Sequence, residues 1–257
     1  MTLELIDTHC HLDFPVFDSN RQQVVDNACG QGVSQIIVPG VTAKDWPRLL
    51  ATCKQYGQPA ALGLHPCFID QHRADDLQQL EVLLASENVV AVGEIGLDFF
   101  VKGLDQERQL QFFSDQLALA NQFSLPVILH VRKAHDQVLK QLRQLKLPRA
   151  GVVHAYSGSE QQAQQYVDLG FKLGIGGTLT YERAKKLRRL VCDLPLASFV
   201  LETDAPDIPL AAHRDQPNQP CRVREVAEVF AELRGVSLEL LAQQTSANAQ
   251  AIFFPQR

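Results

Sequence analysis

Short apolar runs alternate with longer amphipathic segments along the whole chain. Between these runs, apolar residues recur at the spacing of a helix, as in Ala134, Val138 and Leu142. Such alternation is typical of repeated βα units around a parallel sheet. The expected strands cover residues 5–8, 35–38, 60–64, 89–93, 126–129, 151–153, 171–175 and 199–202. Eight strands are what a TIM (β/α)8 barrel requires, so we expect one α/β barrel domain over residues 1–257.

Two further segments bear on this architecture. The segment from Glu107 to Phe123 has a helical pattern and should form the helix after the fourth strand. Residues 205–220 are rich in Pro, Asp and Asn and have no periodicity. A loop of this length is usually functional or disordered. Because it would leave the barrel where the strands end, we expect a substrate-facing loop there rather than a linker.

Side chains that can bind metals stand where several of the apolar runs stop. His9 and His11 are two positions apart, and in a strand such residues point to the same face. A lone H-x-H pair is a weak signal. Four more candidate ligands follow later runs: Glu94, His130, His154 and Asp204. The carboxyl ends of barrel strands share the face that carries barrel active sites, so the pattern predicts one cluster of six ligands.

Six ligands exceed the needs of one ion, because a catalytic zinc typically takes three protein ligands and keeps a position open. We therefore expect two divalent ions, although any one of these histidines alone would more often be structural. Glu94 has two oxygens and lies between the two histidine pairs in strand order, which makes it the natural bridge. Asp204 would complete the first ion's ligands. Such ions lower the pKa of bound water from about 15.7 towards ~7, and Asp204 could accept or pass its proton.

Composition narrows the class of protein. The 257 residues are 46% hydrophobic and 21% charged, as in a soluble globular protein, and the net charge of −5 argues against a broad basic surface for nucleic acid. Six cysteines show no C-x-x-C spacing, and we expect Cys29, Cys53 and Cys192 to be buried free thiols in a reducing cytoplasm. No signal peptide is visible. No apolar run approaches the roughly 20 residues of a membrane span.

Four more polar residues lie at or near strand ends. His65 precedes Pro66 at the end of the third strand and should contact substrate or support the ligands, unless it is structural. Glu202 shares a strand face with Asp204 one layer deeper and should orient the site. Two others follow strand ends and could also contact substrate or support the ligands: Asp98 and Arg132. Arg132 could bind a phosphate oxygen or form a surface salt bridge instead.

These motifs together resemble the TatD family of metal-dependent deoxyribonucleases. The resemblance rests on Ile6-Asp-Thr-His-Cys-His11, Gly63-Leu-His-Pro66, Gly93-Glu-Ile-Gly-Leu-Asp98, His130-Val-Arg132, His154-Ala-Tyr-Ser-Gly158, Leu201-Glu-Thr-Asp-Ala-Pro206 and Thr245-Ser-Ala-Asn248. It spans the chain and implies a TIM barrel of the amidohydrolase kind. It also implies two divalent ions on the six ligands and phosphodiesterase activity towards DNA ends.

The chain departs from the family pattern at two places. Members commonly carry Asn-Glu-Pro after the eighth strand, where this chain has Asn218, Gln219 and Pro220. Many have His-Cys-Phe where this chain has His154 followed by Ala155 and Tyr156. Neither change alters a metal ligand. We expect both to lie at the rim that meets substrate.

The sequence thus predicts a cytoplasmic hydrolase that cleaves phosphodiesters, in the manner of a 3'-5' exonuclease on single-stranded DNA ends. Asp204 and Glu94 are the candidate catalytic residues, the ions being Zn, Mn or Mg. Hydrolysis of a small-molecule amide or ester stays an alternative, because one fold hosts many chemistries. A non-catalytic binding protein is a third, which the complete ligand set disfavours. The expected partners are DNA ends or another phosphodiester, with neither a membrane nor an obligate protein partner.

Overall fold

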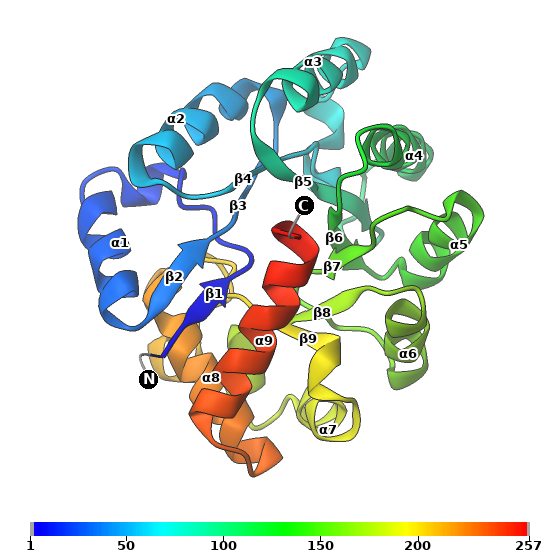
Figure 1. The fold of residues 1–257 in the computed structure, drawn as a ribbon. Coiled ribbons are helices and arrows are strands. Elements are labelled where there is room, and N and C mark those ends of the chain that lie inside the picture. Colours follow the sequence, from blue (N-terminus) through cyan, green and yellow to red (C-terminus); the bar gives the residue numbers. More distant parts are fainter. Residues whose placement is uncertain (1–2, 256–257) are drawn as a thin grey trace.

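Parallel strands form a ring around the centre of the molecule in the computed structural model, which describes residues 3–255 (Figure 1). The first pair is β1 (Leu5–Asp7) with β2 (Val33–Ile36). The remaining strands form a parallel sheet in chain order: β3 (Val38–Pro39), β4 (Ala60–Leu62), β5 (Val89–Asp98), β6 (Val127–Arg132), β7 (Gly151–Val153), β8 (Lys172–Ile175) and β9 (Phe199–Leu201). The expected α/β barrel is confirmed, with the second expected strand present as β2 and β3.

Backbone hydrogen bonds close the ring at both breaks in the sheet. Ile37, between β2 and β3, donates its N–H to the Asp7 carbonyl at 2.8 Å and accepts from Cys10 at 3.1 Å. At the other break, the N–H of Thr8 donates to the Leu201 carbonyl at 3.0 Å. The N–H of Asp204 donates to the His9 carbonyl at 2.8 Å. The last bond joins two candidate ligands through their backbones.

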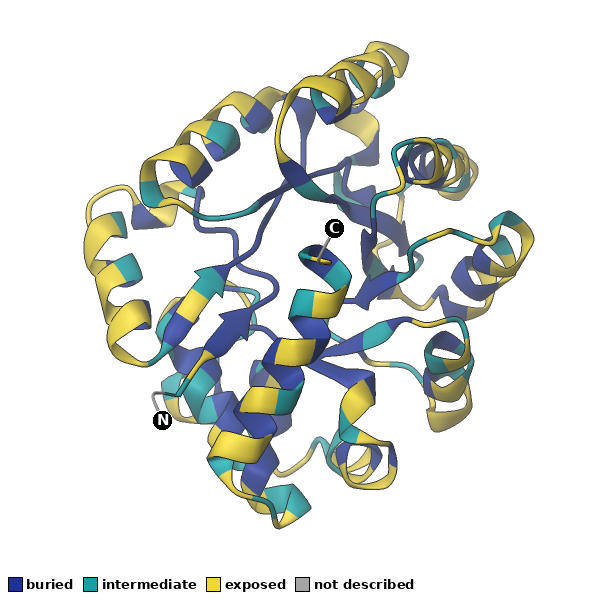
Figure 2. Ribbon diagram, viewed as in Figure 1, coloured by how far each residue is buried: buried dark blue, intermediate teal, exposed yellow. Residues whose placement is uncertain are grey.

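Amphipathic helices surround the ring. In α5 (His135–Leu145), Val138 and Leu142 face inward and are buried, as their helical spacing predicts. Figure 2 shows the same division around the barrel, with buried residues toward the strands and exposed residues outward. The helix expected over Glu107 to Phe123 is present as α4 (Gln106–Gln122). The outer helices are α1 (Arg21–Gly30), α2 (Trp46–Tyr56), α3 (Ala74–Ser86), α4 (Gln106–Gln122), α5 (His135–Leu145), α6 (Glu160–Asp168), α7 (Lys185–Asp193) and α8 (Val223–Arg234).

A last helix, α9 (Leu238–Phe253), lies across the end of the barrel where the strands begin (Figure 1). Its residues Ala249 and Phe253 pack onto a small apolar cluster from the strands and their junctions: Ile6, Ile37, Ala61, Ala91, Ile128, Val152 and Val200. This apolar layer fills the barrel at the end where the strands begin, and α9 covers that end. The candidate ligands lie at the opposite end, where the strands finish.

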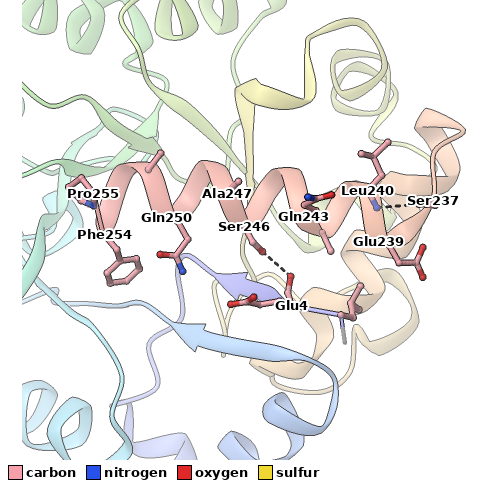
Figure 3. A pocket seen from close by; sticks show the side chains of 13 residues that line it. Glu4, Ser237, Glu239, Leu240, Gln243, Ser246, Ala247, Gln250, Phe254 and Pro255 are labelled. Carbon is pink, nitrogen blue, oxygen red and sulfur yellow. Dashed lines mark hydrogen bonds between the residues drawn. The ribbon is translucent and has the colours of Figure 1, made fainter. Parts of the chain in front are cut away.

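A groove of about 850 Å³ runs beside α9 at this closed end (Figure 3). The Ser246 hydroxyl donates to the Glu4 carbonyl at 3.0 Å and ties α9 to the segment before β1. Among the described residues, those that line the groove include the carboxylates of Glu4 and Glu239 but no histidine or cysteine. The groove is therefore separate from the candidate ligands.

The cysteine expectation was wrong at two positions. All six cysteines are free thiols, and Cys53 is buried as expected. Cys29 and Cys192 are exposed instead, because they lie on the outward faces of α1 and α7. Within residues 3–255, no helix is long and apolar enough to cross a membrane.

Candidate metal centre

A cleft of about 530 Å³ opens at the end of the barrel where the strands finish. Five of the six candidate ligands line it, and His9 is completely buried behind them. They come from different strands: Glu94 lies within β5 and His130 within β6, whereas His154 follows β7 and Asp204 follows β9. Parallel strands bring these distant parts of the chain to one face.

The two N-terminal histidines share a face although the first strand is shorter than expected. β1 ends at Asp7, so His9 and His11 lie beyond it. Cys10 between them forms an isolated parallel bridge with Ala205, which keeps the segment extended. The alternation of an extended chain therefore still directs both imidazoles to one side.

One group of ligands gathers around Oε2 of Glu94. The Nε2 atom of His9 lies 3.1 Å from this oxygen, and Nε2 of His11 lies 3.8 Å from it. Oδ1 of Asp204 is 3.5 Å from His9 Nε2 and 3.6 Å from His11 Nε2. Ligands held about 2.0–2.2 Å from one ion are spaced by roughly 3–4 Å, so these four atoms have the spacing of a coordination shell.

A second group gathers around the other oxygen of Glu94. Oε1 lies 3.1 Å from Nδ1 of His130 and 3.9 Å from Nε2 of His154. Nε2 of His65 is also close, at 3.2 Å from Oε1. His65 therefore lies among the candidate ligands, closer to Glu94 than the sequence suggested. The carboxylate of Glu94 separates the two groups, one on each oxygen.

The charges of the cluster favour ionised carboxylates. Burial alone would raise the pKa of Glu94, but His65, His9 and His154 outweigh it and hold the pKa well below the usual range. The pKa of Asp204 is lowered in the same way, because neighbouring histidines, His154 above all, outweigh the effect of burial. Burial lowers the pKa of His65 to about 4, which leaves its imidazole neutral and able to bind a metal.

An unsatisfied polar atom shows that a cation fits here. Nε2 of His9, which faces Glu94 and Asp204, is buried without a hydrogen-bond partner. Buried polar atoms are normally satisfied, and each exception calls for a missing partner. A divalent ion between His9, His11 and the Glu94 and Asp204 carboxylates would supply it, since neutral imidazole and carboxylate are good ligands for such ions. The donor set therefore fits a metal ion.

Three carboxylates support the cluster from behind. Oε1 of Glu202 lies 3.0 Å from Nδ1 of His154 and accepts the N–H of Ala155 at 2.6 Å. Asp7, which sequence analysis did not single out, accepts the hydroxyl of Thr203 at 2.6 Å and the N–H of His9 at 3.2 Å. A buried carboxylate two residues before an H-x-H pair is the signal that could have identified it.

The third carboxylate, Asp98, connects His130 to the loop after β5. Its Oδ2 lies 2.9 Å from Nε2 of His130, and its Oδ1 accepts the N–H groups of Phe100 and Val101, each at 2.9 Å. Burial alone would raise the pKa of Asp98, but the hydrogen bonds from His130 and the two N–H groups hold it below its usual value. Sγ of Cys67 is 3.5 Å from Oδ2.

Arg132 does not form the surface salt bridge considered from the sequence, and its contact with a phosphate oxygen stays a prediction. Its side chain lines the cleft and has no ion pair among residues 3–255. Its guanidinium carbon instead lies 3.8 Å from the centre of the Phe100 ring. The surface salt bridge is therefore absent, and the positive charge is directed into the mouth of the cleft.

The rim differs in part from expectation. Asp207 and Ile208 of the aperiodic segment line the cleft, as does Ala155. Gln219 and Tyr156 are not among the residues that line the cleft, and their contact with substrate stays a prediction. Tyr156 is buried, and its hydroxyl donates to the Ser159 carbonyl at 2.5 Å.

Asn218, beside Gln219, holds the aperiodic segment in place. Its amide group donates to the carbonyl of Thr203 at 2.8 Å and to that of Ile208 at 3.1 Å. The side chain is completely buried. Asn218 therefore fixes the backbone next to Asp204.

The protein is an α/β barrel that carries a buried cluster of histidines and carboxylates at the carboxyl ends of its strands. This combination defines the class of α/β-barrel metalloenzymes. Comparison with known proteins then gives the family. The model of the family described as TatD related DNase matches residues 6–254. The chain belongs to the TatD family and is a metal-dependent hydrolase.

Individual relatives agree with this assignment. The chain is 46% identical to the uncharacterized metal-dependent hydrolase YjjV of Escherichia coli K12, over 98% of this chain and 99% of that protein. A crystal structure of that protein superposes with a TM-score of 0.95, over 98% of this chain and 99% of its own. The 3'-5' ssDNA/RNA exonuclease TatD of Erwinia amylovora is 34% identical, over 97% and 99% of the two chains.

A more distant structure shares the fold. An uncharacterized amidohydrolase from Saccharomyces cerevisiae has a TM-score of 0.80 at 20% identity, over 98% of this chain and 100% of its own. At that identity the likeness concerns the fold alone. It supports the α/β barrel expected from the sequence.

Proposed function

We propose that this protein is a 3'-5' exonuclease that trims single-stranded DNA ends with two divalent ions. The observation that carries the proposal is the position of Glu94, whose two oxygens face separate groups of histidines. One ion would be held by His9, His11, Glu94 and Asp204, and the other by Glu94, His130 and His154. His65 lies beside the second group and would adjoin its ion.

When bound, such ions would supply Lewis acidity to the phosphate and lower the pKa of water to generate a nucleophile. The chain's own residues would then divide the remaining work. Asp204 would accept the proton of the attacking water, because its pKa is lowered and its carboxylate is ionised at neutral pH. Glu202 would hold the ring of His154 through Nδ1, leaving Nε2 free toward Asp204.

The nucleic-acid substrate is supported by a relative and by the local charge. The Erwinia amylovora protein, which is 34% identical, is named a 3'-5' ssDNA/RNA exonuclease. The net charge of −5 cannot provide long-range attraction to a duplex. DNA would therefore be held by the ions and by a few groups at the mouth, Arg132 among them. A contact limited to the mouth favours chain ends over internal sites.

The test compares an end-labelled linear single strand with a closed circular single strand of the same sequence, in Mg²⁺ and in Mn²⁺. Stepwise trimming of the linear strand with the circle spared is the expected result. Rapid cutting of the circle would contradict the dependence on ends. A panel of small amides and esters is assayed in parallel, and turnover of one of them without nuclease activity would favour the amidohydrolase alternative.

A further inference from the structure

Phe100 is an aromatic residue exposed beside the cleft. It lies in the loop between β5 and α4, and 52% of its surface is accessible to solvent. Single exposed apolar side chains are common on protein surfaces, so the exposure of Phe100 does not by itself assign it a role. Its ring is covered on one side by the guanidinium of Arg132, at 3.8 Å from carbon to ring centre.

The loop that carries Phe100 is fixed rather than free. Asp98 accepts the N–H groups of Phe100 and Val101, and Phe99 donates its N–H to the Arg132 carbonyl at 2.9 Å. Asp98 is itself held by Gln109 of α4, whose amide oxygen accepts the Asp98 N–H at 2.8 Å. The stacked pair is therefore built on a rigid base.

Arg132 presents a flat, charged surface to the cleft. Its guanidinium lines the cleft while Phe100 lies against it. Because guanidinium is planar and delocalised, one face can rest on the phenyl ring while the other stays available for stacking. Among residues 3–255 this side chain has no hydrogen bond, so its N–H edge is also free. Bases of single-stranded nucleic acids stack on such guanidinium planes and on aromatic rings.

We propose that Arg132, backed by Phe100, forms a stacking site for a nucleobase of the terminal dinucleotide of the substrate. This stacking site rests on the proposed exonuclease function and gives that function its specificity for unpaired ends. The base would lie on the cleft-facing side of the guanidinium, with Phe100 as the positioning residue that keeps this plane in place. A base that is paired in a duplex already stacks on its neighbours, so the site selects unpaired ends of any sequence.

The main test uses two linear single strands that differ only at the last two nucleotides. One strand carries adenines there, and the other carries abasic sugars with the same phosphates. Base stacking in single-strand sites corresponds to about 5- to 150-fold in binding. The metal-loaded protein should therefore trim the adenine end with a kcat/KM higher by about that factor.

Variants separate stacking from charge. Arg132→Lys keeps the charge but loses the plane, so it should abolish most of the preference for adenine over the abasic end. Phe100→Ala should reduce the preference, and Phe100→Trp should restore it. Val101→Ala, with 39% exposure in the same loop, is the matched control for Phe100→Ala and should keep the preference. Lys133 is an exposed neighbouring cation, and Lys133→Ala is the control for the Arg132 variant.

A binding readout makes the outcome independent of turnover. An oligonucleotide with 2-aminopurine as its last base and sulfur-substituted terminal phosphates should lose fluorescence on binding to wild-type protein, and much less on binding to Arg132→Lys. Equal trimming of both ends together with unquenched binding would overturn the stacking site and leave the exonuclease standing. Quenched binding without cleavage of any strand would overturn the exonuclease and support the stacking site.

Discussion

Glu202 lies 3.0 Å from His154, with its Oε1 atom beside Nδ1, on the opposite side of the ring from the Nε2 atom that faces Asp204. The pair is buried, with Glu202 1% and His154 5% exposed. A carboxylate in this position fixes the orientation of the imidazole and increases its basicity as a ligand.

Glu202→Gln should therefore weaken metal binding without removing a ligand. Losing such a supporting carboxylate typically costs about 10- to 100-fold in metal affinity. Competition with a chromophoric chelator would measure the change, and circular dichroism would check the fold. The matched control is Glu225→Gln, which removes a carboxylate paired with His213 at 2.9 Å outside the cleft. Equal affinity in Glu202→Gln and wild-type protein would contradict the orienting role.

Glu94→Gln should change the number of bound ions. The substitution keeps the shape of the side chain but removes the charge that would bind two ions at once. Wild-type protein in a metal-replete buffer should hold close to two ions per chain, and the variant at most about one. Elemental analysis after gel filtration measures both. A wild-type protein saturated by one ion, with His130 and His154 directed elsewhere, would rule out the two-ion mechanism.

Asp204→Asn should reduce turnover by at least about 100-fold, the loss typical of a general base. The variant loses both a negative ligand and a proton acceptor, so its metal content is measured beside its rate. Asp207→Asn is the control, because Asp207 also lines the cleft but is not part of either ligand group. A near wild-type rate in Asp204→Asn with its metals intact would show that the role is wrongly assigned.

The metal-free protein should lose stability as the pH rises from about 6.5 to 10. Burial lowers the pKa of His154, but Glu202, Asp204 and Glu94 outweigh it and raise the pKa from 6.5 to about 10. A group whose folded-state pKa is raised stabilises the fold fully below its unfolded pKa, and this contribution is lost as the pH passes the folded pKa.

Urea denaturation of chelator-treated protein at pH 6.5, 8 and 10 would measure this change. Metal binding must displace the same proton, so the metal affinity should rise over the same pH range. Glu202→Gln should flatten the slope in the metal-free protein. A metal-free wild-type protein that becomes more stable toward pH 10 would contradict the raised pKa of His154.

Asn218→Ala should destabilise the protein, since it leaves the buried carbonyl of Thr203 without the amide N–H that it accepts. An unsatisfied buried group costs about 1–3 kcal/mol. Turnover should fall as well, because Thr203 adjoins Asp204. Gln219→Ala is the neighbouring control, and its effect should be small because Gln219 does not line the cleft. Equal unfolding midpoints for the two variants would contradict the role given to Asn218.

Much of this protein was determined by the sequence alone. Apolar runs separated by amphipathic segments predicted the barrel, because strands and helices have different periods of apolar residues. The positions of His130 and His154 at strand ends predicted a shared location, because all strands of a parallel barrel finish at one face. Neither inference needs a distance between residues.

Only the tertiary structure decided which atoms meet within that face. The approach of His65 to Glu94, the contact of Asp98 with His130, and the stacking of Arg132 on Phe100 join residues from different strands and loops. Such contacts depend on the register between neighbouring strands and on side-chain rotamers, which no spacing along the chain encodes. The burial expected for Cys29 and Cys192 was wrong for the same reason, since the orientation of each helix on the barrel is set by packing.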